Sequence, residues 1–95
     1  VTKALIIEAP YYADVAALLR SGAEAELKKE NIAYDIISVP GALEIPAALN
    51  LSLHNKYDIY IVLGCIIRGE TSHYDIVCNE SARGIYALVL EHKLA

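Results

Sequence analysis

Residues 57–73 have the sequence YDIYIVLGCIIRGETSH, which combines a strand, a loop and the start of a helix. The strand candidate, Tyr57 to Leu63, is apolar at every central position, which is typical of a parallel strand covered on both faces. Gly64 to Thr71 has the character of a loop, and Ser72, with Asp75 three residues later, can open a long helix. We therefore expect this strand to lie inside a sheet.

The N-terminal part of the chain shows the same strand and helix order. Ala4 to Ile7 is continuously apolar and predicts another buried strand. Asp14 is a candidate N-cap for a helix that extends to about Asn31, where apolar residues recur with a helical period. Gly22 lies in the apolar stripe of this helix, and because glycine is unfavourable there we interpret it as a site of close helix packing.

The middle of the chain supplies the remaining strand and helix. Tyr34 to Val39 is a strand candidate, and the next helix has Pro46 in its first turn and Asn55 at its end. The resulting β-α-β-α-β-α order predicts an α/β fold, a three-layer α/β/α flavodoxin-like parallel sheet. Three strands are few for such a sheet. We expect residues 1–95 to form a single domain that lacks its last strand and helix, or whose open edge another subunit covers.

Composition limits the class of protein. The chain has 95 residues, which suits one domain, and 8 basic against 12 acidic residues give a net charge of −4. This charge does not favour binding to nucleic acid or to anionic lipid. No apolar stretch approaches the roughly 18 residues of a membrane span, and the N-terminus does not resemble a signal peptide. Cys65 and Cys78 lack CxxC spacing, which fits a reducing compartment, so we expect a cytoplasmic protein without nucleic-acid or membrane partners.

Three loops follow the three predicted strands and should meet at one edge of the sheet, where parallel α/β proteins bind ligands. They are Glu8 to Ala13, Val39 to Glu44 and Gly64 to Ser72. The third is similar to the phosphate loop GxxxxGK[ST], but Glu70 replaces the lysine, and a carboxylate would repel terminal phosphates. Two interpretations stay open for this loop: a site for a single phosphate at a helix N-terminus, and an ordinary capped connection.

Several side chains in these loops have both a functional and a structural explanation. His73 lies in the first turn of its helix, where the dipole favours a neutral imidazole that can act as a general base, but it can equally be an exposed residue. Glu44 can complement a helix dipole or accept hydrogen bonds from a polyhydroxylated ligand. Tyr11 and Tyr12 can stack on a planar heterocycle or simply form a wet aromatic edge. Cys65 has no basic neighbour in sequence, so a small apolar cleft residue is favoured over a nucleophile. The Cys and His residues do not cluster at metal-ligand spacing.

Three segments together resemble the 6,7-dimethyl-8-ribityllumazine synthase family. They are VPGALEIP at 39–46, LGCIIRGETSHY at 63–74 and NESARG at 79–84. The resemblance implies an enzyme of riboflavin biosynthesis, a transferase that condenses 5-amino-6-(D-ribitylamino)uracil with 3,4-dihydroxy-2-butanone 4-phosphate. The family uses no redox cofactor or metal, and its members assemble as homopentamers or as shells of pentamers.

The resemblance also implies roles for individual residues. His73 would transfer protons and Tyr11 would stack on the pyrimidine, while Glu44 would hold the ribityl hydroxyls. The other implied substrate-binding residues are Ala42 and Leu43 in the second loop, Cys65, Ile66 and Ile67 along the ring and side chain, and Glu70 and Thr71 at the phosphate. Two features depart from the family pattern. Pro10 stands where many members have arginine, and the family's fourth strand and following helix, with a phosphate-binding arginine, have no counterpart in residues 1–95.

Two further functions remain alternatives to a synthase. One is a binding module that holds a flavin or lumazine in the same loops without catalysis. The other is a scaffold or shell-forming protein whose assembly does not depend on a ligand. A phosphate-loop enzyme is the least favoured, because of Glu70.

Overall fold

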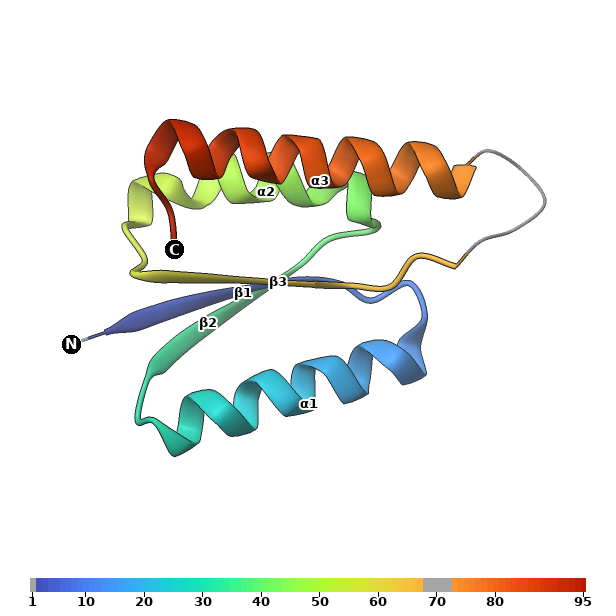
Figure 1. Ribbon diagram of the computed structural model, residues 1–95. Helices are drawn as coiled ribbons and strands as arrows, with labels where there is room; N and C mark the ends of the chain where they lie inside the picture. Colours follow the sequence, from blue (N-terminus) through green and yellow to red (C-terminus); the bar gives the residue numbers. More distant parts are fainter. Residues whose placement is uncertain (1, 68–72) are drawn as a thin grey trace.

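The structure, a computed structural model, describes residues 2–67 and 73–95 and has three layers (Figure 1). The middle layer is a parallel sheet in the order β2-β1-β3, formed by β1 (Lys3–Ala9), β2 (Ala33–Ser38) and β3 (Ile59–Gly64). Helix α1 (Ala13–Lys29) covers one face, and helices α2 (Ile45–Ser52) and α3 (His73–His92) cover the other. The predicted three-layer α/β/α architecture, consistent with the flavodoxin-like fold, is confirmed.

The core lies on both faces of β1, because successive side chains of a strand point to opposite sides. Leu5 and Ile7 belong to the cluster that includes Leu49 of α2. Ala4 and Ile6 point the other way and belong to the cluster that includes Leu27 of α1. Leu5, Ile6 and Ile7 are fully buried, and burying each such side chain contributes about 1.5–3 kcal/mol. Both faces of β1 are therefore covered, which explains why its apolar run is continuous.

Strand β3 forms the open edge that the sequence predicts for a sheet without its last strand. Within the described residues β1 is the central strand and β3 is at an edge, with Ile59 to Leu63 only half-buried. An apolar run indicates that both faces of a strand are covered, but it does not indicate how many strands lie beside that strand. The amide of Tyr60 donates a 2.8 Å hydrogen bond to the carbonyl of Ala95, so the last residue lies beside β3.

Asp14 does not cap α1 as predicted, and Gly22 makes no close contact within this chain. The helix begins at Ala13 with Tyr12 in the N-cap position, so Asp14 lies in the first turn and complements the helix dipole instead of capping it. Gly22 is exposed, and a Cβ built there would have no heavy atom within 4 Å. Gly22 therefore does not mark close helix packing within this chain. Leu18, in the same predicted apolar stripe, is 75% exposed.

The connection from β2 to β3 follows the sequence signals more closely. A single 3₁₀ turn, η1 (Ala42–Glu44), leads into α2, and Pro46 lies in the first turn of that helix as predicted. A second 3₁₀ turn, η2 (Leu53–Asn55), ends the helical segment at the predicted Asn55. Ser72, the predicted start signal for α3, lies outside the described residues. Among the helices of the described ranges, none combines the length and the apolarity needed to cross a membrane.

Candidate functional site

A pocket of about 340 Å³ lies at the edge of the sheet where the strands end. Ligand pockets for small molecules usually have volumes of about 300–1,000 Å³, so this one can admit a small ligand. Its described lining comes from the segments after β1, β2 and β3 and from the first turns of α3: Ala9, Tyr11, Tyr12, Pro40, Gly41, Ala42, Leu43, Glu44, Cys65, Ile66, Ile67, His73 and Val77. The described parts of the three loops thus converge on one cleft, because the carboxyl ends of parallel strands share one edge of a sheet.

Eight of the ten residues predicted for the site line this pocket: Tyr11, Ala42, Leu43, Glu44, Cys65, Ile66, Ile67 and His73. The other two, Glu70 and Thr71, lie outside the described residues. The structure therefore brings together side chains that are separated by up to about two thirds of the chain. Their individual roles are taken up as proposals below.

Tyr11 and Tyr12 form the aromatic part of the pocket. Their rings make an edge-to-face pair, with centroids 5.0 Å apart and planes at 80°. Helix α1 starts at the next residue, so the pair is anchored between β1 and the helix. Tyr11 is 75% exposed, which leaves ring surface available to a planar ligand. Tyr12 was treated at the sequence level as part of the aromatic pair, and its place in the pocket lining extends the predicted set.

Glu44 provides the acidic group of the pocket. It is the last residue of η1, and its amide donates a 3.1 Å hydrogen bond to the carbonyl of Gly41. Its side chain folds back toward Gly41, because Oε1 lies 3.1 Å from the point where a Cβ on that residue would be. An ionised carboxylate only accepts hydrogen bonds, so this part of the pocket suits a ligand that carries hydroxyl groups.

His73 is the first residue of α3, and Val77, one helical turn later, also lines the pocket. His73 is exposed, whereas Val77 is buried and extends the apolar wall toward the core. Imidazole is the side chain that most often serves as a general acid or base in enzymes, so this wall of the pocket carries a group suited to proton transfer. The spacing of four residues, which places both side chains on one face of the helix, is the sequence signal that would have found Val77.

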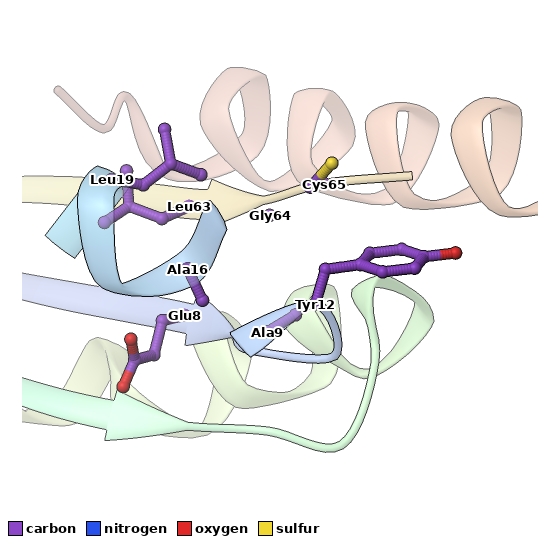
Figure 2. A pocket seen from close by; sticks show the side chains of 8 residues that line it. All are labelled: Glu8, Ala9, Tyr12, Ala16, Leu19, Leu63, Gly64 and Cys65. Carbon is purple, nitrogen blue, oxygen red and sulfur yellow. The ribbon is translucent and has the colours of Figure 1, made fainter. Parts of the chain in front are cut away.

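Cys65 lines this pocket and also a smaller gap, and Figure 2 shows the side chains that line the gap. The gap lies between α1 and the ends of β1 and β3, and it is too narrow to hold a water molecule. Cys65 is half-buried and is a free thiol. This apolar setting fits the interpretation of Cys65 as a cleft residue. Among the described residues, no group of three or more His, Cys, Asp or Glu side chains is placed to hold a metal ion.

A buried carboxylate behind the pocket was not predicted from the sequence. Glu8, near the end of β1, is 4% exposed. Its Oε2 accepts a 2.6 Å hydrogen bond from the hydroxyl of Ser38 and a 3.0 Å hydrogen bond from Arg20. In the sequence Glu8 is a single charged residue directly after an apolar run. Because the predicted strand ended at Ile7, Glu8 was assigned to the loop that follows it.

Arg20 of α1 connects Glu8 of β1 to a second acidic residue, Glu24, which lies one turn further along α1. Its Nε lies 3.3 Å from Oε1 of Glu24, and the hydroxyl of Tyr34 donates a 2.6 Å hydrogen bond to the other oxygen of Glu24. The hydrogen bond from Tyr34, with a smaller contribution from Arg20, lowers the pKa of Glu24. The same hydrogen bond raises the pKa of Tyr34. Helix α1 is thus fastened to β2 by a chain of polar contacts.

A separate polar cluster fastens the opposite end of the sheet. Lys3 forms a 3.1 Å ion pair with Asp35, and the hydroxyl of Tyr57 donates a 2.6 Å hydrogen bond to the same carboxylate oxygen. The hydrogen bond from Tyr57, followed by the interaction with Lys3, lowers the pKa of Asp35. These contacts join β1, β2 and the segment before β3 far from the pocket, so we assign this cluster a structural role.

Arg83 and Glu80, within the third of the resembling segments, pair on the surface of α3. The Nε of Arg83 donates a 2.9 Å hydrogen bond to Glu80, and both side chains are largely exposed. Their spacing of three residues makes the two side chains neighbours on the helix surface, which accounts for the pair.

Comparison with known proteins identifies the group to which the chain belongs. The family profile described as 6,7-dimethyl-8-ribityllumazine synthase matches residues 2–95. A protein of that name from Beijerinckia indica subsp. indica is 59% identical over 93 residues, which cover 95% of this chain and 51% of the relative. Its namesake from Bartonella tribocorum is 48% identical, over 96% of this chain and 62% of the relative.

A third relative, from Rhizobium meliloti, is named 6,7-dimethyl-8-ribityllumazine synthase 1 and is 46% identical over 97 residues. The alignment covers 96% of this chain and 63% of that relative. The chain therefore spans about half to three fifths of the length of these curated relatives. The profile match and the identities lead to one conclusion: the chain belongs to the 6,7-dimethyl-8-ribityllumazine synthase family.

Proposed function

We propose that the protein is a lumazine synthase, which condenses 5-amino-6-(D-ribitylamino)uracil with 3,4-dihydroxy-2-butanone 4-phosphate in riboflavin biosynthesis. The observation that carries the proposal is the pocket of about 340 Å³ that Tyr11, Glu44 and His73 line together. An aromatic ring, an acceptor for hydroxyl groups and a proton-transfer group are the parts needed to hold a flat heterocycle with a sugar-like chain beside a reacting carbonyl.

The pyrimidine and its ribityl chain would occupy the part of the pocket between the first two loops. Tyr11 would stack on the ring, because its face is available and aromatic stacking is favourable for planar heterocycles. Glu44 would accept hydrogen bonds from the ribityl hydroxyls. Backbone and side chains of Ala42, Leu43, Cys65, Ile66 and Ile67 would line the remaining length of the ligand. The mainly apolar character of these residues would exclude water from the ring.

His73 would move protons during imine formation and loss of phosphate and water. These steps mainly require that the two reactants are aligned and that a proton is transferred at the right place, so one histidine and a shaped pocket can suffice. As the family resemblance implies, Glu70 and Thr71 would meet the phosphate of the second substrate. No redox cofactor or metal is required by this reaction.

The protein would act in the cytoplasm as a homopentamer or as a shell of pentamers, with residues 1–95 belonging to a single domain. Large apolar side chains are exposed on several elements, with Leu18 at 75%, Leu51 at 72% and Tyr86 at 63%. Assembly would cover these side chains if the surfaces that carry them pack against other copies of the chain. The half-buried edge strand β3 supports the same proposal.

The direct test mixes both substrates with the natural full-length protein and records the fluorescence of the lumazine product. Each substrate alone, and both substrates without protein, serve as controls. We expect product only in the complete mixture, at a rate proportional to protein concentration. Binding of a flavin or lumazine without product formation would replace the proposal with the binding-module alternative.

A further inference from the structure

Glu8 is bonded to both residues that lead into the second loop of the pocket. In the sheet register Glu8 lies opposite Ser38, the last residue of β2. Its backbone carbonyl accepts a 2.8 Å hydrogen bond from the amide of Val39, and its carboxylate accepts a 2.6 Å hydrogen bond from the hydroxyl of Ser38. Pro40, the next residue, already lines the pocket.

Glu8 is equally close to the first loop. Ala9 follows it directly and lines the pocket, and Tyr11 comes two residues later. Glu8 itself is not among the described residues that line this pocket. Figure 2 shows its carboxylate directed toward β2, whereas the ring of Tyr12 extends beyond the ends of the strands. Glu8 can therefore influence a ligand through the two loops that it connects.

The carboxylate of Glu8 is held in one orientation. Its side chain is 5% exposed, and a buried carboxylate needs charged or polar partners to offset its desolvation. Arg20 provides the positive charge at 3.0 Å, and Glu24 in turn contacts Arg20 at 3.3 Å. Because hydrogen bonds to charged groups are stronger than neutral ones, the bond from Ser38 to Glu8 is a firm connection between the two strand ends.

We infer that Glu8, through its bonds to Ser38 and Val39, is a positioning residue that sets the distance between Tyr11 in the first loop and Glu44 in the second. The inference rests on the proposed function for the identity of the ligand, which would span these two side chains with its ring and its hydroxylated chain. A change in their spacing should weaken binding of that ligand more than it affects the proton transfers at His73.

The test uses substitutions at the two bonded residues in the natural full-length protein. Ser38→Ala removes the hydroxyl donor, Glu8→Gln removes the charge, and Ser38→Thr restores a hydroxyl. We expect KM for 5-amino-6-(D-ribitylamino)uracil to rise about 5- to 10-fold for Ser38→Ala and less for Glu8→Gln, with kcat within about twofold of the original protein. Ser38→Thr should recover most of the lost affinity.

Asp35→Asn is the matched control, because it weakens the contact between the same two strands at the end away from the pocket. The KM of each variant is read together with its loss of Tm, so that general destabilisation is separated from an effect on the pocket. We expect Asp35→Asn to lower Tm while it changes KM by less than about twofold. If Asp35→Asn raised KM as much as Ser38→Ala does, or if Ser38→Ala left KM unchanged, the positioning role of Glu8 would be overturned.

Hydrogen exchange in the ligand-free protein separates this inference from the proposed function. Ser38→Ala should speed exchange of the amides of Val39 and residues 41–45, whereas Asp35→Asn should leave them unchanged. A protein without synthase activity would disprove the proposed function, and this measurement would still decide the role of Glu8. Unchanged exchange in Ser38→Ala would contradict it.

Discussion

Helix α3 packs so closely against α2 that a Cβ on Gly84 would lie 2.8 Å from Cγ of Pro46. The proline ring is part of the backbone of α2 and cannot rotate away. Helix α2 begins directly after Glu44, and α3 begins at His73. The contact between Gly84 and Pro46 therefore holds together the helix that directly follows Glu44 and the helix that begins with His73.

Replacement of Gly84 by alanine should destabilise the protein. Overpacking of a close contact costs about 1–3 kcal/mol. The higher helix propensity of alanine would offset about 1 kcal/mol of that cost. We therefore expect Gly84→Ala to lower Tm.

Gly22→Ala is the matched control for Gly84→Ala, because both glycines lie within helices. A Cβ on Gly22 meets nothing within 4 Å, so alanine should add about 0.5–1 kcal/mol of stability through the lower entropy of the unfolded chain. Thermal unfolding of both variants tests the pair. A loss of stability at Gly22 would show that this side of α1 is packed against another segment or another copy of the chain.

Replacement of Gly41 by alanine should weaken ligand binding with little effect on stability. The new Cβ would lie 3.1 Å from Oε1 of Glu44, so the carboxylate must move by a few tenths of an ångström. The backbone of Gly41 is extended, with φ of −154°, and alanine can adopt it without strain. Titration with 5-amino-6-(D-ribitylamino)uracil should show an affinity about 2- to 5-fold lower, with Tm nearly unchanged. Unchanged affinity would mean that Glu44 does not contact the ligand.

Stability should fall in acid partly because of Asp35. The hydrogen bond from Tyr57 and the interaction with Lys3 lower its pKa below the ordinary value of 3.8. A group whose pKa is lower in the folded state contributes stability above its unfolded pKa and loses it as the pH falls through the folded pKa. Glu24, whose pKa is lowered from 4.5, acts in the same direction. The loss should therefore occur below about pH 4.5 and continue below pH 3.8.

Unfolding measured from neutral to acidic pH checks this account of the acid range. Asp35→Asn should reduce stability at pH 7 and make the remaining stability less dependent on pH. Tyr57→Phe should act in the same direction as Asp35→Asn, because it removes the hydrogen bond that lowers the pKa most. A pH dependence identical to that of the original protein in both variants would contradict the assignment.

The elements of the fold could be predicted from the sequence because their signals are local. Apolar runs located the three strands, and Pro46 and Asn55 marked the two ends of one helical segment. Lateral position in the sheet is not given by these signals, because the apolar run of β3 does not say how many strands lie beside it, and in the described part of the chain β3 forms an edge. The same limit applies to Gly22, since a helical stripe of small and apolar residues does not say what covers it.

The candidate site was predictable to the extent that topology determines it. Parallel strands bring their following loops to one edge, so the residues of three loops converge on one pocket. Glu8 was missed because its importance depends on Ser38, 30 residues away in sequence, and on Arg20 across the face of the sheet. Such contacts depend on tertiary packing and leave no periodic signal in the sequence.

The His73→Ala variant of the natural full-length protein tests the central claim most directly. Turnover and the dissociation constant for 5-amino-6-(D-ribitylamino)uracil are measured on the same preparation. If His73 only transfers protons, its removal should lower kcat by about tenfold or more, while the affinity for the pyrimidine changes by less than about twofold. Equal losses in turnover and in affinity would contradict the assignment of His73 as the proton-transfer residue of one shared pocket.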